Sequence, residues 1–239
     1  MRTPAADNMV MIALHGLVTS RAEVDFFLRP LMWGFPVKGV RWVVPKAPLR
    51  PVTLLGGQPA RAWYDLVNWD PLCKDAQGIE AATCAIEQIV LKEKANGVRP
   101  QQIVLAGFSQ GGQLALHAGL RLRQSIGAVV SLSAALPFPD EIPAAEGAAP
   151  PIFMAHGLLD SVVPSSWGSD SARLLESKGY EVSWQGYPIG HSVSWQELGD
   201  VAAWLENRVA AKKTVRAATA PRAAVTRNEA SREYAVQAV

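Results

Sequence analysis

Short apolar runs that alternate with longer amphipathic segments constrain the fold of this chain more than any other feature. Most of these runs lack the alternation of a half-exposed strand, which is typical of strands buried on both faces of a parallel sheet. The runs span residues 9–14, 40–44, 103–106, 128–132, 152–155 and 182–185. Because segments with helical spacing separate them, the pattern predicts an α/β fold with a mostly parallel sheet covered by helices on both faces.

Apolar side chains at helical spacing mark the segments between these runs. One stripe, within residues 79–90, is followed by lysines and stops near Gly97. Others lie at 114–122, at 174–175 and at 201–205. Two stretches do not fit the rhythm. Residues 45–70 are rich in proline and glycine and predict a long irregular excursion, whereas residues 137–151 predict a surface connection or part of a cap.

The domain boundary is predicted near residue 210. Residues 1–210 are long enough for one domain with a substantial core, and we expect little or no cap domain. Residues 211–239 are basic and contain no Leu, Ile, Phe or Trp, so we expect a disordered, solvated tail. A membrane-surface or partner-binding role for this tail, including a homodimer formed through it, remains an alternative.

Composition argues against several classes of protein. A net charge of +2 does not indicate a nucleic-acid binder. Cys73 and Cys84 lack metal-ligand spacing, which favours free thiols in a reduced compartment. The apolar run at 9–14 is too short for a signal peptide or a transmembrane helix. We therefore expect a soluble, cytoplasmic protein without stable membrane insertion.

The segment Gly107-Phe108-Ser109-Gln110-Gly111 matches the G-x-S-x-G pattern of a nucleophile turn. The pattern alone is weak, but this copy follows a predicted strand and leads directly into an amphipathic segment. A serine in such a turn has unfavourable backbone dihedral angles, and side chains two positions before and after it would clash. The pattern predicts Ser109 as a nucleophile beside the N-terminus of a helix.

A serine nucleophile needs a base, and the base needs an orienting acid. In the strand–turn–helix setting of this motif, the acid and then the histidine follow the serine along the chain. His191 is the one histidine that fits, because His15, His117 and His156 all precede the candidate acid. That acid is Asp160, which directly follows the predicted strand at 152–155. Structural packing or loop hydrogen bonding is the predicted role of His117 and His156.

The oxyanion of an acyl-transfer intermediate needs two N–H donors. One is expected from Gln110, the residue after the nucleophile, and the other from the loop after the first strand. That loop contains Gly16, whose small size allows the backbone amides to turn inward, and we predict Leu17 as the second donor.

Taken together, these motifs resemble the phospholipase/carboxylesterase family of α/β-hydrolases, which contains small carboxylesterases and acyl-protein thioesterases. The matching stretches run in family order over residues 9–208. They are Leu14-His-Gly-Leu17, Pro45-Lys-Ala-Pro-Leu-Arg-Pro-Val-Thr-Leu54, Ala62-Trp-Tyr-Asp65, Gly107-Phe-Ser-Gln-Gly-Gly112, His156-Gly157 with Asp160 and Val163-Pro164, and Gly190-His-Ser-Val193. The proline-rich stretch followed by Trp-Tyr-Asp is more specific than G-x-S-x-G.

The resemblance implies cleavage of carboxylic esters or thioesters with short to medium acyl chains through a Ser109–His191–Asp160 triad, without a metal or organic cofactor. It also implies that Leu54, Trp63 and Val162 border an acyl channel, although Trp63 fits the core equally well. Two departures from the family pattern, at Val18-Thr19 and at Leu55, predict a bulkier and less polar rim. An acyl-protein thioesterase or lysophospholipase would share this site, and a non-catalytic binding protein would share the scaffold.

Overall fold

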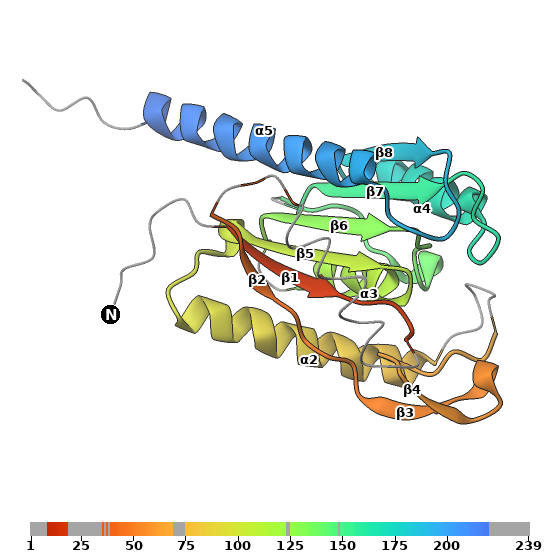
Figure 1. Ribbon diagram of the computed structural model, residues 1–239. Helices are drawn as coiled ribbons and strands as arrows, with labels where there is room; N and C mark the ends of the chain where they lie inside the picture. The colour runs from red at the N-terminus through yellow and green to blue at the C-terminus, as the bar shows by residue number, and fades with distance from the viewer. Residues whose placement is uncertain are drawn as a thin grey trace, which may run out of the picture.

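The structure is a computed structural model that describes residues 9–18, 35, 37, 39–68, 75–122, 125–147 and 149–219, with side chains placed up to Arg208. Among these residues, six strands form one sheet in the order β2-β1-β5-β6-β7-β8 (Figure 1). All neighbouring strands of this sheet are parallel. The strands are β1 (Val10–Leu14), β2 (Arg41–Val43), β5 (Ile103–Phe108), β6 (Ala128–Leu132), β7 (Ile152–Gly157) and β8 (Val182–Tyr187). Each apolar run predicted as a strand forms one of them.

Helices pack on both faces of the sheet, as predicted. They are α2 (Ala76–Ala95), α3 (Gln110–Gly119), α4 (Ser165–Ser177) and α5 (Trp195–Thr219). Side chains alternate along β1, so that Ile12 and Leu14 join the core cluster that contains residues of α2, α3 and α4. Met11 points to the opposite face, into a second cluster that contains Val201 and Leu205 of α5. Figure 1 shows α5 on one side of the sheet and α2 with α3 on the other.

The stretch predicted to be an irregular excursion contains regular structure. Strands β3 (Leu49–Val52) and β4 (Gln58–Arg61) form an antiparallel hairpin, joined by the 3₁₀ helix η1 (Thr53–Leu55). The prediction missed this hairpin because both of its strands contain proline. Pro51 and Pro59 lie directly opposite each other. In a ribbon of two strands, a proline nitrogen can point outward without interrupting the ladder of hydrogen bonds.

In the described part of the connection between β6 and β7 there is one short 3₁₀ helix, η3 (Pro139–Glu141), in agreement with a surface connection and little cap. Helix α3 ends at Gly119, before the predicted stripe reaches Leu122. At the other end of the chain, the backbone of α5 continues past the predicted boundary at residue 210 as far as Thr219. The first part of the segment expected to be disordered is therefore helical, and residues 220–239 lie outside the described residues.

Candidate active site

The turn between β5 and α3 holds Ser109 in a strained conformation. Its backbone has φ 54° and ψ −122°, a region that residues with a Cβ rarely occupy. Strain of this kind costs about 1–3 kcal/mol and persists only where the surrounding structure fixes it. Here the amide of Ser109 donates to the carbonyl oxygen of Leu132, at a distance of 2.9 Å. The turn is thus anchored to the end of the neighbouring strand β6.

Glycines on either side of Ser109 allow α3 to cross the sheet at very short range. A Cβ atom on Gly107 would collide with the backbone of Gly111. A Cβ atom on Gly111 would collide with the backbone carbonyl of Leu14, at the end of β1. The turn therefore has the steric requirement that the G-x-S-x-G pattern predicts.

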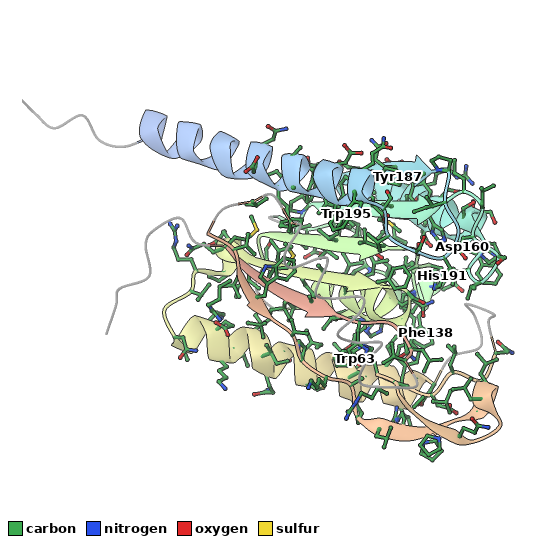
Figure 2. The ribbon with its side chains drawn as sticks, viewed as in Figure 1. Trp63, Phe138, Asp160, Tyr187, His191 and Trp195 are labelled. Atoms are coloured by element: carbon green, nitrogen blue, oxygen red, sulfur yellow. The ribbon has the colours of Figure 1, made fainter. Side chains whose placement is uncertain are left out.

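Three side chains from distant parts of the chain meet at the carboxyl edge of the sheet. Ser109 follows β5, Asp160 follows β7, and His191 follows β8. Atom Nε2 of His191 lies 3.0 Å from Oγ of Ser109, and atom Nδ1 lies 2.7 Å from Oδ2 of Asp160. Figure 2 shows Asp160 and His191 next to each other at this edge. The structure thus brings together the serine, base and acid predicted from the sequence.

The carboxyl group of Asp160 is buried and held on both oxygens. Atom Oδ1 accepts hydrogen bonds from the amides of Val162 and Val163, at 2.8 and 2.9 Å. Atom Oδ2 faces Nδ1 of His191 and lies 3.4 Å from Nε2 of His156. The two backbone amides fix the plane of the carboxyl group, so Oδ2 is aimed at His191.

His156 has the loop hydrogen bond predicted for it. Its Nε2 lies 2.9 Å from the carbonyl oxygen of Val163, which can only accept, so this nitrogen carries the hydrogen. Burial lowers the pKa of His156, which favours a neutral ring. A neutral His156 contributes no second positive charge next to Asp160.

These contacts also define the tautomer of His191. An ionised carboxylate is only an acceptor, so Nδ1 of His191 carries the hydrogen that Asp160 accepts. The lone pair of Nε2 then faces the hydroxyl of Ser109. The ring of Phe108 packs against the imidazole, with 4.8 Å between ring centroids. This arrangement is suited to the transfer of a proton from Ser109 to His191.

The residues predicted to supply oxyanion donors lie on either side of Ser109. Gln110 is the first residue of α3, where backbone amides have no partner within the helix. Gly16 lies against the nucleophile, since a Cβ atom at this position would be 3.3 Å from the Cβ of Ser109. Leu17 is the next residue along this loop. Both predicted donors therefore belong to segments that border Ser109.

The residues predicted to border an acyl channel have different surroundings. Leu54 is half-buried in η1, and Val162 is half-buried next to Asp160, to whose carboxylate its amide donates. Trp63 is only 6% exposed, and its indole N–H donates to the carbonyl oxygen of His15. A channel role for all three stays a prediction.

His117 lies away from this site and joins two helices. Its Nδ1 lies 2.9 Å from Oγ1 of Thr83, which itself donates to the carbonyl oxygen of Ile79. Burial lowers the pKa of His117 to about 4, so the ring is neutral near pH 7. Its contacts link α3 to α2 and are structural, as predicted.

A parallel sheet with a strained serine after β5 and a histidine after β8 defines the chain as an α/β-hydrolase. Residues 3–209 match the sequence profile of the phospholipase/carboxylesterase family. The chain therefore belongs to the phospholipase/carboxylesterase family, and it is a hydrolase of the carboxylesterase and thioesterase type.

Individual relatives agree with this assignment. Acyl-protein thioesterase 1 of Gibberella zeae is 34% identical over 185 residues, which cover 72% of this chain and 79% of the relative. Acyl-protein thioesterase 1 of Yarrowia lipolytica is 30% identical over 213 residues, which cover 86% and 94%. The crystal structure of Arabidopsis thaliana SOBER1 superimposes with a TM-score of 0.75 at 27% identity, covering 84% of this chain and 99% of that one.

None of the helices in the described ranges combines the length and the apolar character needed to cross a bilayer.

Proposed function

We propose that the protein hydrolyses carboxylic esters or thioesters of short to medium acyl chains through Ser109, His191 and Asp160. One observation carries the proposal: the imidazole of His191 bridges the hydroxyl of Ser109 and the carboxylate of Asp160, at 3.0 and 2.7 Å. A serine activated in this way attacks acyl carbonyl carbons.

Acylation begins when Oγ of Ser109 attacks the carbonyl carbon of the substrate and Nε2 of His191 takes its proton. Asp160 stabilises the imidazolium that forms. The tetrahedral intermediate then collapses, the bond to the leaving oxygen or sulfur breaks, and His191 gives its proton to that atom. Water repeats the sequence on the acyl-enzyme, which releases the carboxylic acid and restores Ser109.

Negative charge on the carbonyl oxygen of the substrate requires stabilisation during both halves of this cycle. We assign this role to the backbone amides of Leu17 and Gln110, which lie in the two segments that border Ser109. The loss of one such donor typically lowers turnover by about 10²–10³-fold. The N-terminus of α3 adds a favourable dipole at the same place.

Two other functions use the same residues. An acyl-protein thioesterase is favoured by the names of the relatives from Gibberella zeae and Yarrowia lipolytica. A lysophospholipase would share the site and differ only in its rim and in the length of the acyl channel, which Leu54, Trp63 and Val162 are predicted to border. A non-catalytic binding protein would not need a serine, a histidine and an aspartate that are hydrogen-bonded in series.

A cytoplasmic location, a possible homodimer and the absence of nucleic-acid partners stay predictions.

The decisive experiment measures hydrolysis of ester and thioester substrates of graded acyl length by the wild type and by Ser109→Ala. We expect turnover to fall by about 10⁴–10⁶-fold in the variant, with an unchanged circular-dichroism spectrum. A fluorophosphonate probe should label the wild type and not Ser109→Ala. Retention of more than a few per cent of activity would contradict the proposal, and an unlabelled wild type would favour a binding protein.

Ser133→Ala is a matched control. Ser133 lies just beyond β6, one strand away from Ser109, and it is likewise a buried serine with a positive φ, of 49°. Its hydroxyl has no hydrogen-bond partner among the described residues. Removal of this hydroxyl should leave both turnover and probe labelling at the level of the wild type.

A further inference from the structure

The side chain of Gln110 is engaged away from the substrate. Its Oε1 accepts a hydrogen bond from the amide of Trp63 at 3.0 Å, and its Nε2 donates to the carbonyl oxygen of Tyr64 at 2.9 Å. Among the uncharged side chains, only Asn and Gln carry an acceptor and a two-hydrogen donor on one planar group. Gln110 thereby clamps the backbone of residues 63 and 64 to the first turn of α3.

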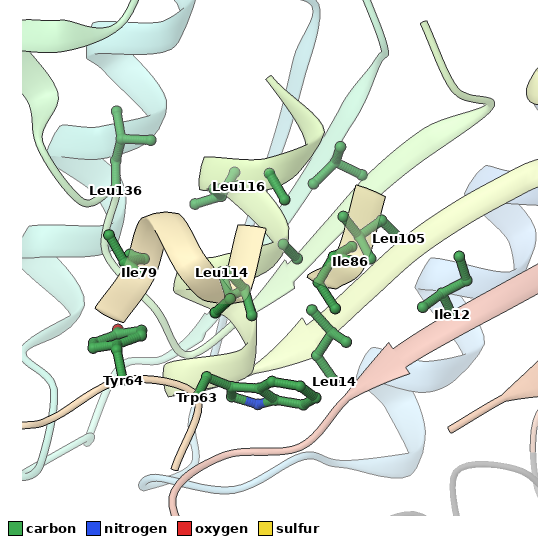
Figure 3. Close-up of a cluster of buried hydrophobic side chains, with 14 of the residues drawn as sticks. Ile12, Leu14, Trp63, Tyr64, Ile79, Ile86, Leu105, Leu114, Leu116 and Leu136 are labelled. Carbon is green, nitrogen blue, oxygen red and sulfur yellow. The ribbon is translucent and has the colours of Figure 1, made fainter. Parts of the chain in front are cut away.

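Trp63 continues this connection to the other side of Ser109. Its indole Nε1 donates to the carbonyl oxygen of His15 at 2.8 Å, and its ring lies 5.2 Å from the imidazole of His15. Figure 3 shows Trp63 beside Leu14, at the end of β1. Trp63 therefore contacts both segments to which the proposed oxyanion donors belong.

The imidazole of His15 fixes the direction of the peptide unit between Gly16 and Leu17. The amide of Ala47 donates to Nε2 of His15 at 3.1 Å, so Nδ1 carries the hydrogen. Nδ1 then donates to the carbonyl oxygen of Gly16, at 2.7 Å. Burial lowers the pKa of His15 and keeps this ring neutral.

The carbonyl of Gly16 and the N–H of Leu17 belong to one planar trans peptide unit, in which they point in opposite directions. A hydrogen bond that holds the oxygen of Gly16 therefore also sets the direction of the Leu17 amide. On the far side of Leu17, Val18 forms an antiparallel bridge with Arg61, with N–O distances of 2.9 and 3.3 Å. The chain is thus held both before and after Leu17 by residues 61–63.

We propose that Trp63 is a positioning residue that holds the amides of Leu17 and Gln110 at the separation an oxyanion requires. The inference rests on the proposed serine hydrolase mechanism and deepens it. Trp63 touches neither the reacting carbonyl nor Ser109 in this role. It acts through His15 on one side and through the side chain of Gln110 on the other, and this differs from a role in lining the acyl channel.

The test is Trp63→Phe, which keeps an aromatic ring but removes the N–H that holds His15. We expect kcat to fall by about 10- to 100-fold, as is typical of a misplaced catalytic group, with KM changed less than about twofold. A boronic acid that matches the acyl group mimics the tetrahedral intermediate and should bind more weakly by a similar factor. The carboxylate product resembles the ground state, so its inhibition constant should stay unchanged.

Trp204→Phe is the matched control. The indole of Trp204 donates to Oγ of Ser183 at 2.9 Å, between α5 and β8, so the same substitution removes a comparable bond elsewhere. Its kcat should equal that of the wild type. If Trp63→Phe fails to fold, Gln110→Met takes its place, because it removes both clamp bonds and keeps the backbone amide; the same loss of kcat and of boronate affinity is then expected.

Two results would overturn the inference: an unchanged kcat in Trp63→Phe, with or without a rise in KM, and an equal loss of kcat in Trp204→Phe. A rise in KM alone would instead place Trp63 on the acyl channel. Fluorophosphonate labelling of the wild type separates this failure from failure of the proposed function. If the wild type is labelled and active and Trp63→Phe has an unchanged kcat, only the positioning role of Trp63 is contradicted. If the wild type is not labelled, the serine hydrolase mechanism itself is contradicted.

Discussion

Gly111 in the first turn of α3 packs directly against the backbone carbonyl of Leu14, the last residue of β1. This contact sets the distance between the helix that follows Ser109 and the loop that contains Gly16. A Cβ atom at position 111 would overlap with backbone rather than with a flexible side chain, so neither partner can yield by a rotamer change. One glycine thus couples the geometry of the nucleophile turn to that of the loop opposite.

Gly111→Ala should therefore impair both folding and hydrolysis. Overpacking against backbone is expected to lower the free energy of unfolding by about 2–3 kcal/mol, measured by urea denaturation. In the remaining folded protein, the displaced helix should lower kcat for ester hydrolysis. Gly199→Ala is the control, because a Cβ atom at this position of α5 meets nothing within 4 Å. It should increase stability by about 0.5–1 kcal/mol; equal effects of the two changes would refute the steric argument.

Asp160→Asn tests the acid separately from the nucleophile. An asparagine can present its NH₂ group to Nδ1 of His191, which favours the tautomer with a hydrogen on Nε2 and removes the base that Ser109 needs. We expect kcat to fall by about 10⁴-fold with little change in KM. Asp140→Asn, at an exposed aspartate in η3, should leave kcat unchanged. A loss below tenfold in Asp160→Asn would show that His191 does not depend on this carboxylate.

The sequence was sufficient to predict the strands of the sheet, because their apolar runs are interrupted by clear turn residues. It also predicted which loops would bring Ser109, Asp160 and His191 together, since the carboxyl ends of parallel strands share one edge. The hairpin of β3 and β4 was not predicted because each of its short strands contains a proline, Pro51 or Pro59, which argues against a strand. Its existence depends on contacts far along the chain, such as those of Arg61 with Val18.

The hydrogen bonds of Trp63 with His15 and Gln110 could not be predicted from a local sequence pattern either. They join His15, Trp63 and Gln110, which are far apart in the sequence, and each of these residues has an ordinary alternative role in a core or turn. The start of α5 does have a local sequence signal, although it was not used to predict this helix. Ser194 and Glu197 form an S-x-x-E capping box, and the structure shows its reciprocal hydrogen bonds at 3.1 and 3.3 Å.

The tail beyond residue 210 is predicted to contribute nothing to catalysis. The guanidinium of Arg208 lies 4.3 Å from the ring centroid of Trp204 and pairs with Glu181. A chain that ends at residue 210 keeps these contacts. Its ester hydrolysis rate and its oligomeric state, measured by light scattering, should equal those of the full chain. A change of oligomeric state on truncation would instead support a role for the tail in dimer formation.

Arg208→Ala in the full chain should lower the free energy of unfolding by about 1 kcal/mol.

Glu197 lies in the first turn of α5, directly after the loop that contains His191, and is fully buried. One carboxylate oxygen accepts the amide of Ser194, while the other, Oε1, is buried without a hydrogen-bond partner among the described residues. Burial raises the pKa of Glu197 from 4.5 to about 7. In the unfolded chain the carboxyl group is in water and has its ordinary pKa. Between these two pH values the folded protein therefore binds a proton that the unfolded chain has lost.

The contribution of Glu197 to stability therefore falls as pH rises from about 4.5 through about 7, because its ionisation is disfavoured only in the folded state. Glu197→Gln keeps an acceptor for Ser194 and cannot ionise. In urea denaturation, its stability relative to the wild type should therefore be higher at pH 8 than at pH 5, by at most about 3 kcal/mol. Glu176→Gln, at an exposed position of α4, should show no such difference between the two pH values. If Glu197→Gln changed stability equally at pH 5 and pH 8, the carboxyl group of Glu197 would not carry its proton into the neutral range.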